Sequence, residues 1–154
     1  LYAEHARGLF AFLAYRTGDR SLAEEVLAEA FEKALRARGG FDPRRAAAKT
    51  WLYAIALNCL RDRRRRGEAE SRALDRLGAD SARAPHADEI GRIEERDALA
   101  RALSTLSAEE REAIALRYGG ALTVPEISRL LDEKLTTVEG RVYRALGKLR
   151  AELS

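Results

Sequence analysis

Apolar residues recur at three- and four-residue steps through most of this chain, which is the pattern of amphipathic helices. Alanine, leucine, glutamate and arginine dominate while strand-forming residues are sparse, so the composition favours an all-α fold. The pattern predicts helices from Tyr2 to Arg16, from Ser21 to the glycines at 39 and 40, from Pro43 to about Arg66, from Asp88 through Leu106, from Ser107 to Gly119, and two shorter ones that begin near Thr123 and Thr136.

Several of these predicted helices carry a start signal. A Ser or Thr followed three residues later by Glu favours a capping box, in which each of the two side chains accepts a backbone hydrogen bond at the helix start. Asp42 before Pro43 is another start signal, an N-cap followed by proline at the first helical position. Capping boxes are predicted at Ser21–Glu24, Ser107–Glu110, Thr123–Glu126 and Thr136–Glu139.

The segment between the two groups of helices differs in composition. Residues 67–87 lack aromatic side chains and contain Gly78 and Pro85, and residues 67–97 carry a net charge of −4, against +6 for residues 1–66. We therefore expect a flexible linker at 67–87 between two small helical domains, residues 1–66 and a four-helix unit at 88–154. Such a linker does not fix one domain against the other, so the sequence leaves their arrangement open.

Residue types that carry most enzyme chemistry are scarce. Cys59 is the single cysteine, which excludes an internal disulfide, and its apolar neighbours favour a packed core thiol over a reactive one. His5 and His86 are far apart and unaccompanied, so we expect no metal site, no cofactor and no enzymatic activity. No apolar run approaches the ~20 residues of a membrane span and no signal peptide is visible, which predicts a cytoplasmic protein without membrane insertion.

Residues 123–150 have the pattern of a helix-turn-helix. Two amphipathic helices are separated by a tight turn at Asp132–Lys134, and the second carries Arg141, Arg144 and Lys148 off its apolar stripe. In DNA-binding proteins of this kind the second helix enters the major groove. Two short amphipathic helices also occur in many helical bundles, so this pattern alone leaves both interpretations open.

The third predicted helix ends in four consecutive arginines, Arg63–Arg66. They are consistent with a solvated helix end that complements the helix dipole, or with contacts to phosphates. Arg44, Arg45, Lys49 and Trp51 precede them, and a basic face with an aromatic ring suits single-stranded nucleic acid. For Trp51 itself, a core position is favoured over a stacking platform.

At this point the chain resembles a known family. The stretch FDPRRAAAKTWLYAIALNCLRDRRRR is similar to region 2 of bacterial sigma factors of the extracytoplasmic-function group, and AEEVLAEAF is similar to their preceding helix. The stretches LSTLSAEEREAIALRYGGALTVPEISRLL and TTVEGRVYRALGKLR resemble region 4. The resemblance covers Tyr2–Arg66 and about Asp97–Leu153, and both halves in this order make it specific.

The resemblance implies a promoter-recognition factor whose partners are core RNA polymerase (through the β′ clamp coiled coil and the β flap), promoter DNA and an anti-sigma factor. It implies polymerase contacts at Glu24, Glu25, Ala28 and Glu29, with Ala28 where the family often has glutamine. Contacts with the −10 element and its flipped base are expected at Arg38, Phe41, Arg44, Arg45, Lys49, Trp51, Asn58, Arg61, Arg64 and Arg65. Contacts with the −35 element are expected at Thr137, Glu139, Gly140, Arg141, Tyr143, Arg144 and Lys148.

The predicted recognition helix departs from the family at two positions. Glu139 replaces a basic residue and Gly140 replaces a serine. Glu139 either accepts a hydrogen bond from cytosine N4 or completes the capping box with Thr136, and the cap is the favoured interpretation. Together with Ala28, these departures keep a second function open, namely a sigma-like interaction module that binds polymerase or an anti-sigma factor with weakened DNA recognition. A one-component repressor, the third option, leaves residues 43–66 unexplained.

Overall fold

A computed structural model describes residues 2–44, 47–77 and 90–153 of the chain. The helices are α1 (Tyr2–Thr17), α2 (Arg20–Ala37), a 3-10 turn η1 (Arg38–Gly40), α3 (Ala48–Leu77), α4 (Ile90–Ser104), α5 (Ala108–Ile114), a π-helical turn η3 (Ala115–Gly119), α6 (Val124–Leu131) and α7 (Leu135–Leu153). These described residues contain no strand, which confirms the predicted all-α class.

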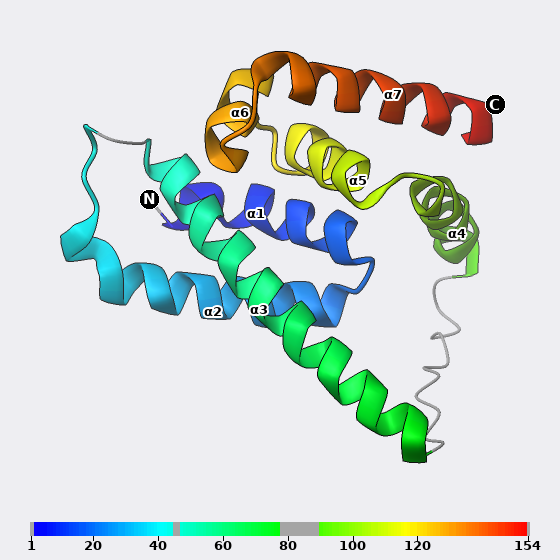
Figure 1. The fold of residues 1–154 in the computed structure, drawn as a ribbon, viewed down its shortest axis with the longest axis horizontal. Coiled ribbons are helices and arrows are strands. Elements are labelled where there is room, and N and C mark those ends of the chain that lie inside the picture. Colours follow the sequence, from blue (N-terminus) through cyan, green and yellow to red (C-terminus); the bar gives the residue numbers. More distant parts are fainter. Residues whose placement is uncertain (1, 45–46, 78–89, 154) are drawn as a thin grey trace.

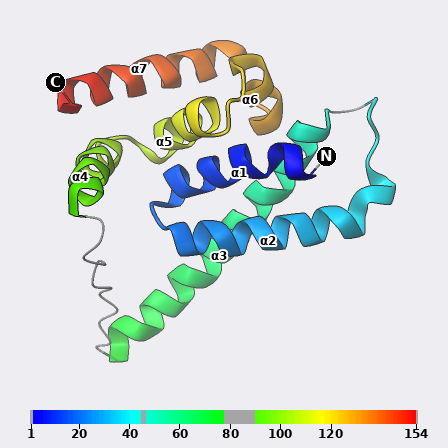
Figure 2. The same ribbon diagram turned by 180° about the vertical axis from the view of Figure 1, so that it is seen from behind.

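Helix α1 lies at the centre of the molecule. On one side it packs against α2, which in turn packs against α3, and on the other side it packs against η3 at the end of α5 (Figure 1). Helix α7 covers the far side of α5 and also contacts α4 and α6, as the view from behind shows (Figure 2). The helices before and after residues 78–89 are therefore in direct contact.

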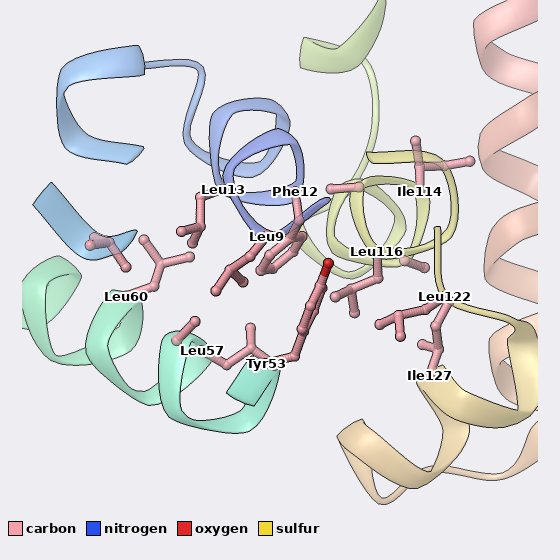
Figure 3. Close-up of a cluster of buried hydrophobic side chains, with 14 of the residues drawn as sticks. Leu9, Phe12, Leu13, Tyr53, Leu57, Leu60, Ile114, Leu116, Leu122 and Ile127 are labelled. Carbon is pink, nitrogen blue, oxygen red and sulfur yellow. The ribbon is translucent and has the colours of Figure 1, made fainter. Parts of the chain in front are cut away.

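One hydrophobic core runs through both groups of helices. Leu9, Phe12 and Tyr53 from the first group meet Leu116 and Leu122 from the second, and all five side chains are buried (Figure 3). Burying side chains of this size stabilises the fold by about 1.5–3 kcal/mol each relative to exposure. The remaining core is mostly alanine and leucine, since the composition offers few aromatic residues.

Two predicted helix starts in the first half are wrong. The N-cap of α2 is Asp19, not Ser21, and its Oδ1 accepts a hydrogen bond from the Leu22 N–H at 3.2 Å. Helix α3 begins at Ala48 instead of Pro43. The carboxyl of Asp42 accepts from the Arg44 N–H at 2.9 Å, a local turn that competes with helix initiation at this position.

Helix α3 also extends beyond the predicted end at Arg66. It continues through Gly67 to Leu77 and so includes the first part of the predicted linker. Residues 68–77 are rich in alanine, glutamate, arginine and leucine, and these strong helix formers outweigh the roughly 1 kcal/mol cost of one internal glycine. The rest of the predicted linker, and the predicted helix start at Asp88, lie outside the described residues.

In the second half, two capping boxes are confirmed. Ser107–Glu110 opens α5 and Thr123–Glu126 opens α6, each with both reciprocal hydrogen bonds. The predicted box at Thr136 is wrong, because α7 already begins at Leu135 and the Val138 N–H donates to the Lys134 carbonyl. Glu139 therefore lies inside the helix and is not part of a cap.

None of the helices in the described ranges is both long and apolar enough to cross a membrane. Cys59 is buried in the core, and its burial raises the pKa of the thiol, which favours the protonated, unreactive form.

Candidate nucleic-acid interface

Helices α6 and α7 form a helix-turn-helix. Helix α6 ends at Asp132, whose φ of 53° reverses the chain into the turn before Leu135. Ile127 of α6 and Val138, Val142 and Ala145 of α7 are buried, so the apolar faces of the two helices fix their mutual orientation. The pattern in residues 123–150 thus predicted the motif, and the packing of both helices bears it out.

The face of α7 opposite these buried residues is an exposed stripe. Thr136, Glu139, Tyr143 and Gly147 recur at three- and four-residue steps and are exposed, with Gly140 beside them half-buried. Tyr143 is 81% exposed, far more than any other large apolar side chain in the described chain. Tyr143 therefore presents most of its ring and its hydroxyl to solvent within the stripe.

The basic residues of α7 lie beside this stripe and are held by carboxylates. Arg141 Nη1 lies 2.8 Å from Glu133 Oε1, and Lys148 Nζ lies 2.7 Å from Glu110 Oε1. Arg144 is more loosely placed, with its Nε 3.8 Å from Glu110 Oε2. The hydrogen bond from Lys148 lowers the pKa of the Glu110 carboxyl, and the hydrogen bond to Glu133 raises the pKa of Arg141.

Gly140 affects the position of Arg144. A Cβ at residue 140 would lie 3.0 Å from Arg144 Nη1, so the guanidinium occupies space that any larger residue would partly fill. The contact is with the end of a flexible side chain, which can move away. The glycine, which the sequence singled out only as a departure, thus allows Arg144 to fold back along its own helix.

A second candidate surface lies at the start and along one side of α3. Phe41 and Trp51 pack against each other with ring centroids 4.9 Å apart, and Trp51 also packs against the core, as its favoured interpretation predicted. Asn58, Arg61, Arg64 and Arg65 are exposed on α3. Arg38 and Arg44 are exposed before the helix, and Arg45 lies outside the described residues.

Arg63 differs from its neighbours in the arginine run. Its Nε donates to Glu29 Oε2 at 2.8 Å and its Nη1 donates to Glu25 Oε2 at 2.9 Å. The hydrogen bond from Arg63 lowers the pKa of Glu29. Two of the residues predicted to contact polymerase are therefore ion-pair partners of the basic helix, while Glu24 and Ala28 are exposed.

Comparisons with known proteins match both halves of the chain. Residues 1–70 match Sigma-70 region 2 and residues 96–149 match Sigma-70 region 4. The ECF RNA polymerase sigma factor SigK of Mycobacterium sp. (strain KMS) is 32% identical over 86% of this chain and 70% of its own length. SigL of Mycobacterium tuberculosis (strain ATCC 25618 / H37Rv) is 30% identical over 99% of this chain and 86% of its own length.

This chain belongs to the ECF sigma factors of the sigma-70 family.

Two solved structures resemble this one over nearly its whole length. RpoE of Bartonella quintana, crystallised with the anti-sigma factor NepR, has a TM-score of 0.79 and 25% identity over 98% of this chain and 92% of its own. CnrH in complex with the cytosolic domain of CnrY has a TM-score of 0.69 and 28% identity over 98% of this chain and 83% of its own. The packing of regions 2 and 4 in this sigma factor therefore resembles their arrangement in these two solved structures.

Regions 2 and 4 of this sigma factor meet at a polar contact inside the core. The Tyr53 hydroxyl of α3 donates to the Gly120 carbonyl at 3.2 Å, and Lys49 Nζ donates to the Ala121 carbonyl at 3.1 Å. Nearby, Arg16 Nε of α1 lies 3.6 Å from Glu112 Oε1 of α5, and both side chains are largely buried. Lys49, predicted to contact −10 DNA, is thus engaged with region 4 in this arrangement.

Sequence reasoning missed these contacts between the two regions. The two residues of each pair are 67 to 96 positions apart in the sequence. Helical periodicity relates residues only a few positions apart, so it carries no information about these contacts. The paired glycines at 119 and 120 were a usable signal. A Cβ at Gly120 would lie 2.8 Å from Tyr53 Cε2, and one at Gly119 would lie 2.9 Å from Tyr15 Cδ2, so both positions require close approach.

Proposed function

We propose that this sigma factor binds core RNA polymerase and directs it to specific promoters, with α7 on the −35 element and the α3 surface on the −10 element. The observation that carries the proposal is the helix-turn-helix of α6 and α7. One whole face of α7, the second helix, is exposed. Tyr143, which is 81% exposed, lies in the middle of this face, and basic residues lie along one edge of it. That arrangement suits a helix whose exposed face contacts the edges of bases and whose flank contacts phosphates.

The −10 part of the proposal rests on the surface around Phe41 and Trp51. The half-buried aromatic pair offers apolar surface at the start of α3, and Asn58, Arg61 and Arg65 are exposed farther along the same helix, so one helix offers partners for a stacked base and for a phosphate backbone. Taking a base out of the duplex costs a few kcal/mol, which contacts of this kind must offset. Arg38 and Arg44 extend the same positive surface towards the loop.

For polymerase binding we propose the exposed side of α2. Glu24 and Ala28 are exposed there, and Glu25, with its side chain 62% exposed, keeps part of its carboxylate accessible despite its pair with Arg63. We propose an anti-sigma protein as a further partner, because RpoE and CnrH are described in complexes with NepR and CnrY, respectively. In this proposal the chain acts by binding and performs no catalysis of its own.

The second candidate function is an interaction module with weakened DNA recognition. It is favoured by one observation, that Lys49 and Tyr53 of region 2 are engaged with region 4 in the packed arrangement. Promoter binding through both regions would require these contacts to open, if the two DNA elements lie farther apart than the packed surfaces allow.

Transcription in vitro with purified core polymerase tests the proposal. The wild-type chain is expected to produce discrete transcripts from a promoter library, while core alone produces none above background. Binding to core without specific initiation would support the interaction module instead. Sequence-specific DNA binding that needs no polymerase would support a repressor.

A further inference from the structure

Glu139 lies on the exposed face of the recognition helix. It lies in the second turn of α7, and Tyr143 follows one turn later on the same face. Residues near the N-terminus of such a helix are those that reach base edges. The carboxylate therefore lies in the part of the helix where base contacts are expected.

The Glu139 carboxylate is free to accept a hydrogen bond from another molecule. The capping role that the sequence favoured is wrong, because α7 starts at Leu135 and its first-turn hydrogen bond runs from the Val138 N–H to the Lys134 carbonyl. Within the part of the chain that the structure describes, no ion pair or hydrogen bond involves the Glu139 side chain. The other acids around α7 are engaged, Glu110 with Lys148 and Glu133 with Arg141.

The basic residues of α7 are arranged around this position in a complementary way. Arg141 and Lys148 lie beside the stripe and are held by Glu133 and Glu110. Arg144 lies between Arg141 and Lys148 in the sequence of α7, and its side chain is 60% exposed. Along the stripe, the carboxylate of Glu139 and the ring of Tyr143 come first, ahead of any cationic side chain. This order is unusual for a surface that contacts DNA.

A carboxylate distinguishes bases by its chemistry. It only accepts hydrogen bonds, and in the major groove cytosine presents a donor, N4–H, while guanine presents two acceptors that repel it. Adenine presents a donor beside an acceptor, which suits an amide better than a carboxylate. Glutamate at this position therefore favours cytosine over the other three bases.

We propose that Glu139 is a specificity-determining residue that selects cytosine at one position of the −35 element. This inference rests on the proposed function, since it assumes that α7 enters the −35 major groove. It predicts a promoter preference that a basic residue at the same position would not produce, because arginine pairs with guanine instead.

The test uses the full chain with core polymerase and a promoter library randomised across the −35 element, sequenced after selection for transcripts. The wild-type protein is expected to enrich cytosine at one position, with about a tenfold loss of initiation for other bases there. Glu139→Arg should move the preference at that position to guanine, and Glu139→Gln should move it towards adenine. Glu152→Gln, an exposed carboxylate near the other end of α7, is the matched control and should leave the selected sequences unchanged.

The outcomes distinguish a failure of this inference from a failure of the proposed function. If the wild-type chain initiates with a defined −35 preference and both Glu139 variants select the same bases as wild type, the assignment of Glu139 is overturned while the sigma function stands. If the wild-type chain initiates on no member of the library, the proposed function fails and this inference fails with it. Changes at several positions at once would also count against it, since one side chain reads one base pair.

Discussion

The hydroxyl of Tyr53 donates a hydrogen bond to the carbonyl of Gly120, 3.2 Å away, and so links region 2 to region 4 inside the core. The phenol ring stacks near Phe12, with ring centroids 6.0 Å apart, and lies against glycines on two sides. Burial raises the pKa of this hydroxyl, so it stays a hydrogen-bond donor over the whole physiological range. Each of the first two predictions below concerns this contact.

Tyr53→Phe should weaken the packing of the two regions. The change removes the donor and leaves the buried Gly120 carbonyl without it, at a cost of about 1–2 kcal/mol in the free energy of unfolding. Urea denaturation of the purified chain measures the difference. Tyr143→Phe is the matched control, because Tyr143 is 81% exposed and its hydroxyl is hydrated in both states. Equal stability of Tyr53→Phe and wild type would mean that the hydrogen bond contributes nothing to the packed arrangement.

Gly120→Ala should destabilise the protein through a steric clash. The new Cβ would lie 2.8 Å from Tyr53 Cε2 and 3.0 Å from the Leu116 carbonyl oxygen, neither of which can move freely in the core. Overpacking of this kind costs about 1–3 kcal/mol. Gly147→Ala makes the same chemical change on the exposed face of α7 with nothing within 4 Å, and should be neutral or slightly stabilising. Thermal melting of both variants distinguishes the two effects, and a stable Gly120→Ala protein would contradict this close approach.

The ion pair between Glu110 and Lys148 should make stability depend on acid pH. The hydrogen bond from Lys148 keeps the folded-state pKa of Glu110 below its usual 4.5, so the carboxylate stabilises the fold above that pH. The contribution disappears as pH falls through the lowered folded pKa. Glu110→Gln retains an amide that can fill the capping box, so it should cost about 1 kcal/mol near pH 7 and much less near pH 3.

Urea titrations of wild type and Glu110→Gln at the two pH values give the measurement. Glu109→Gln, an exposed neighbour in the same first turn of α5, should behave like wild type at both. A Glu110→Gln deficit that is the same at both pH values would show that the charge of Glu110 is unimportant.

Arg63 and Arg66 should differ although they are neighbours in one arginine run. Arg63→Ala breaks two partly exposed ion pairs, with Glu25 and Glu29, and should lower stability by about 1 kcal/mol. Arg66 is exposed, so Arg66→Ala should leave the melting temperature unchanged. If Arg66 contacts promoter phosphates, its loss should instead reduce the salt dependence of open-complex formation by about one counterion. Identical melting temperatures for the two variants would contradict the structural role of Arg63.

Arg144→Ala should reduce the dependence of initiation on the −35 element. The side chain is 60% exposed and only loosely paired with Glu110, so its removal costs little stability but removes a positive charge from the edge of the recognition helix. Binding to a −10 fragment should be unaffected. Initiation from templates with and without a −35 element measures the effect, and Arg101→Ala on the exposed side of α4 is the control. Equal loss on both templates would argue against a −35 role.

Local physics allowed much of this fold to be predicted. At Ser107 and Thr123 the predicted capping boxes are present, with both reciprocal hydrogen bonds. The same reasoning failed at Thr136, where the preceding turn had already started the helix, and at Asp42, where the carboxyl bonded to a nearer backbone group. Start signals are therefore reliable only where no nearer hydrogen bond competes with them.

The helical class, the helix-turn-helix and the family follow from the amino-acid order, because periodicity, caps and motifs depend on residues close together in the chain. Tertiary structure alone decided that regions 2 and 4 share one core, that Arg63 is tied to Glu25 and Glu29, and that Glu139 is left exposed on the recognition helix. These depend on contacts between distant segments, where shape and burial select one partner among many charged residues. The pattern of a single helix shows which face is polar, and only its neighbours decide which of those polar groups stay unpaired at the surface.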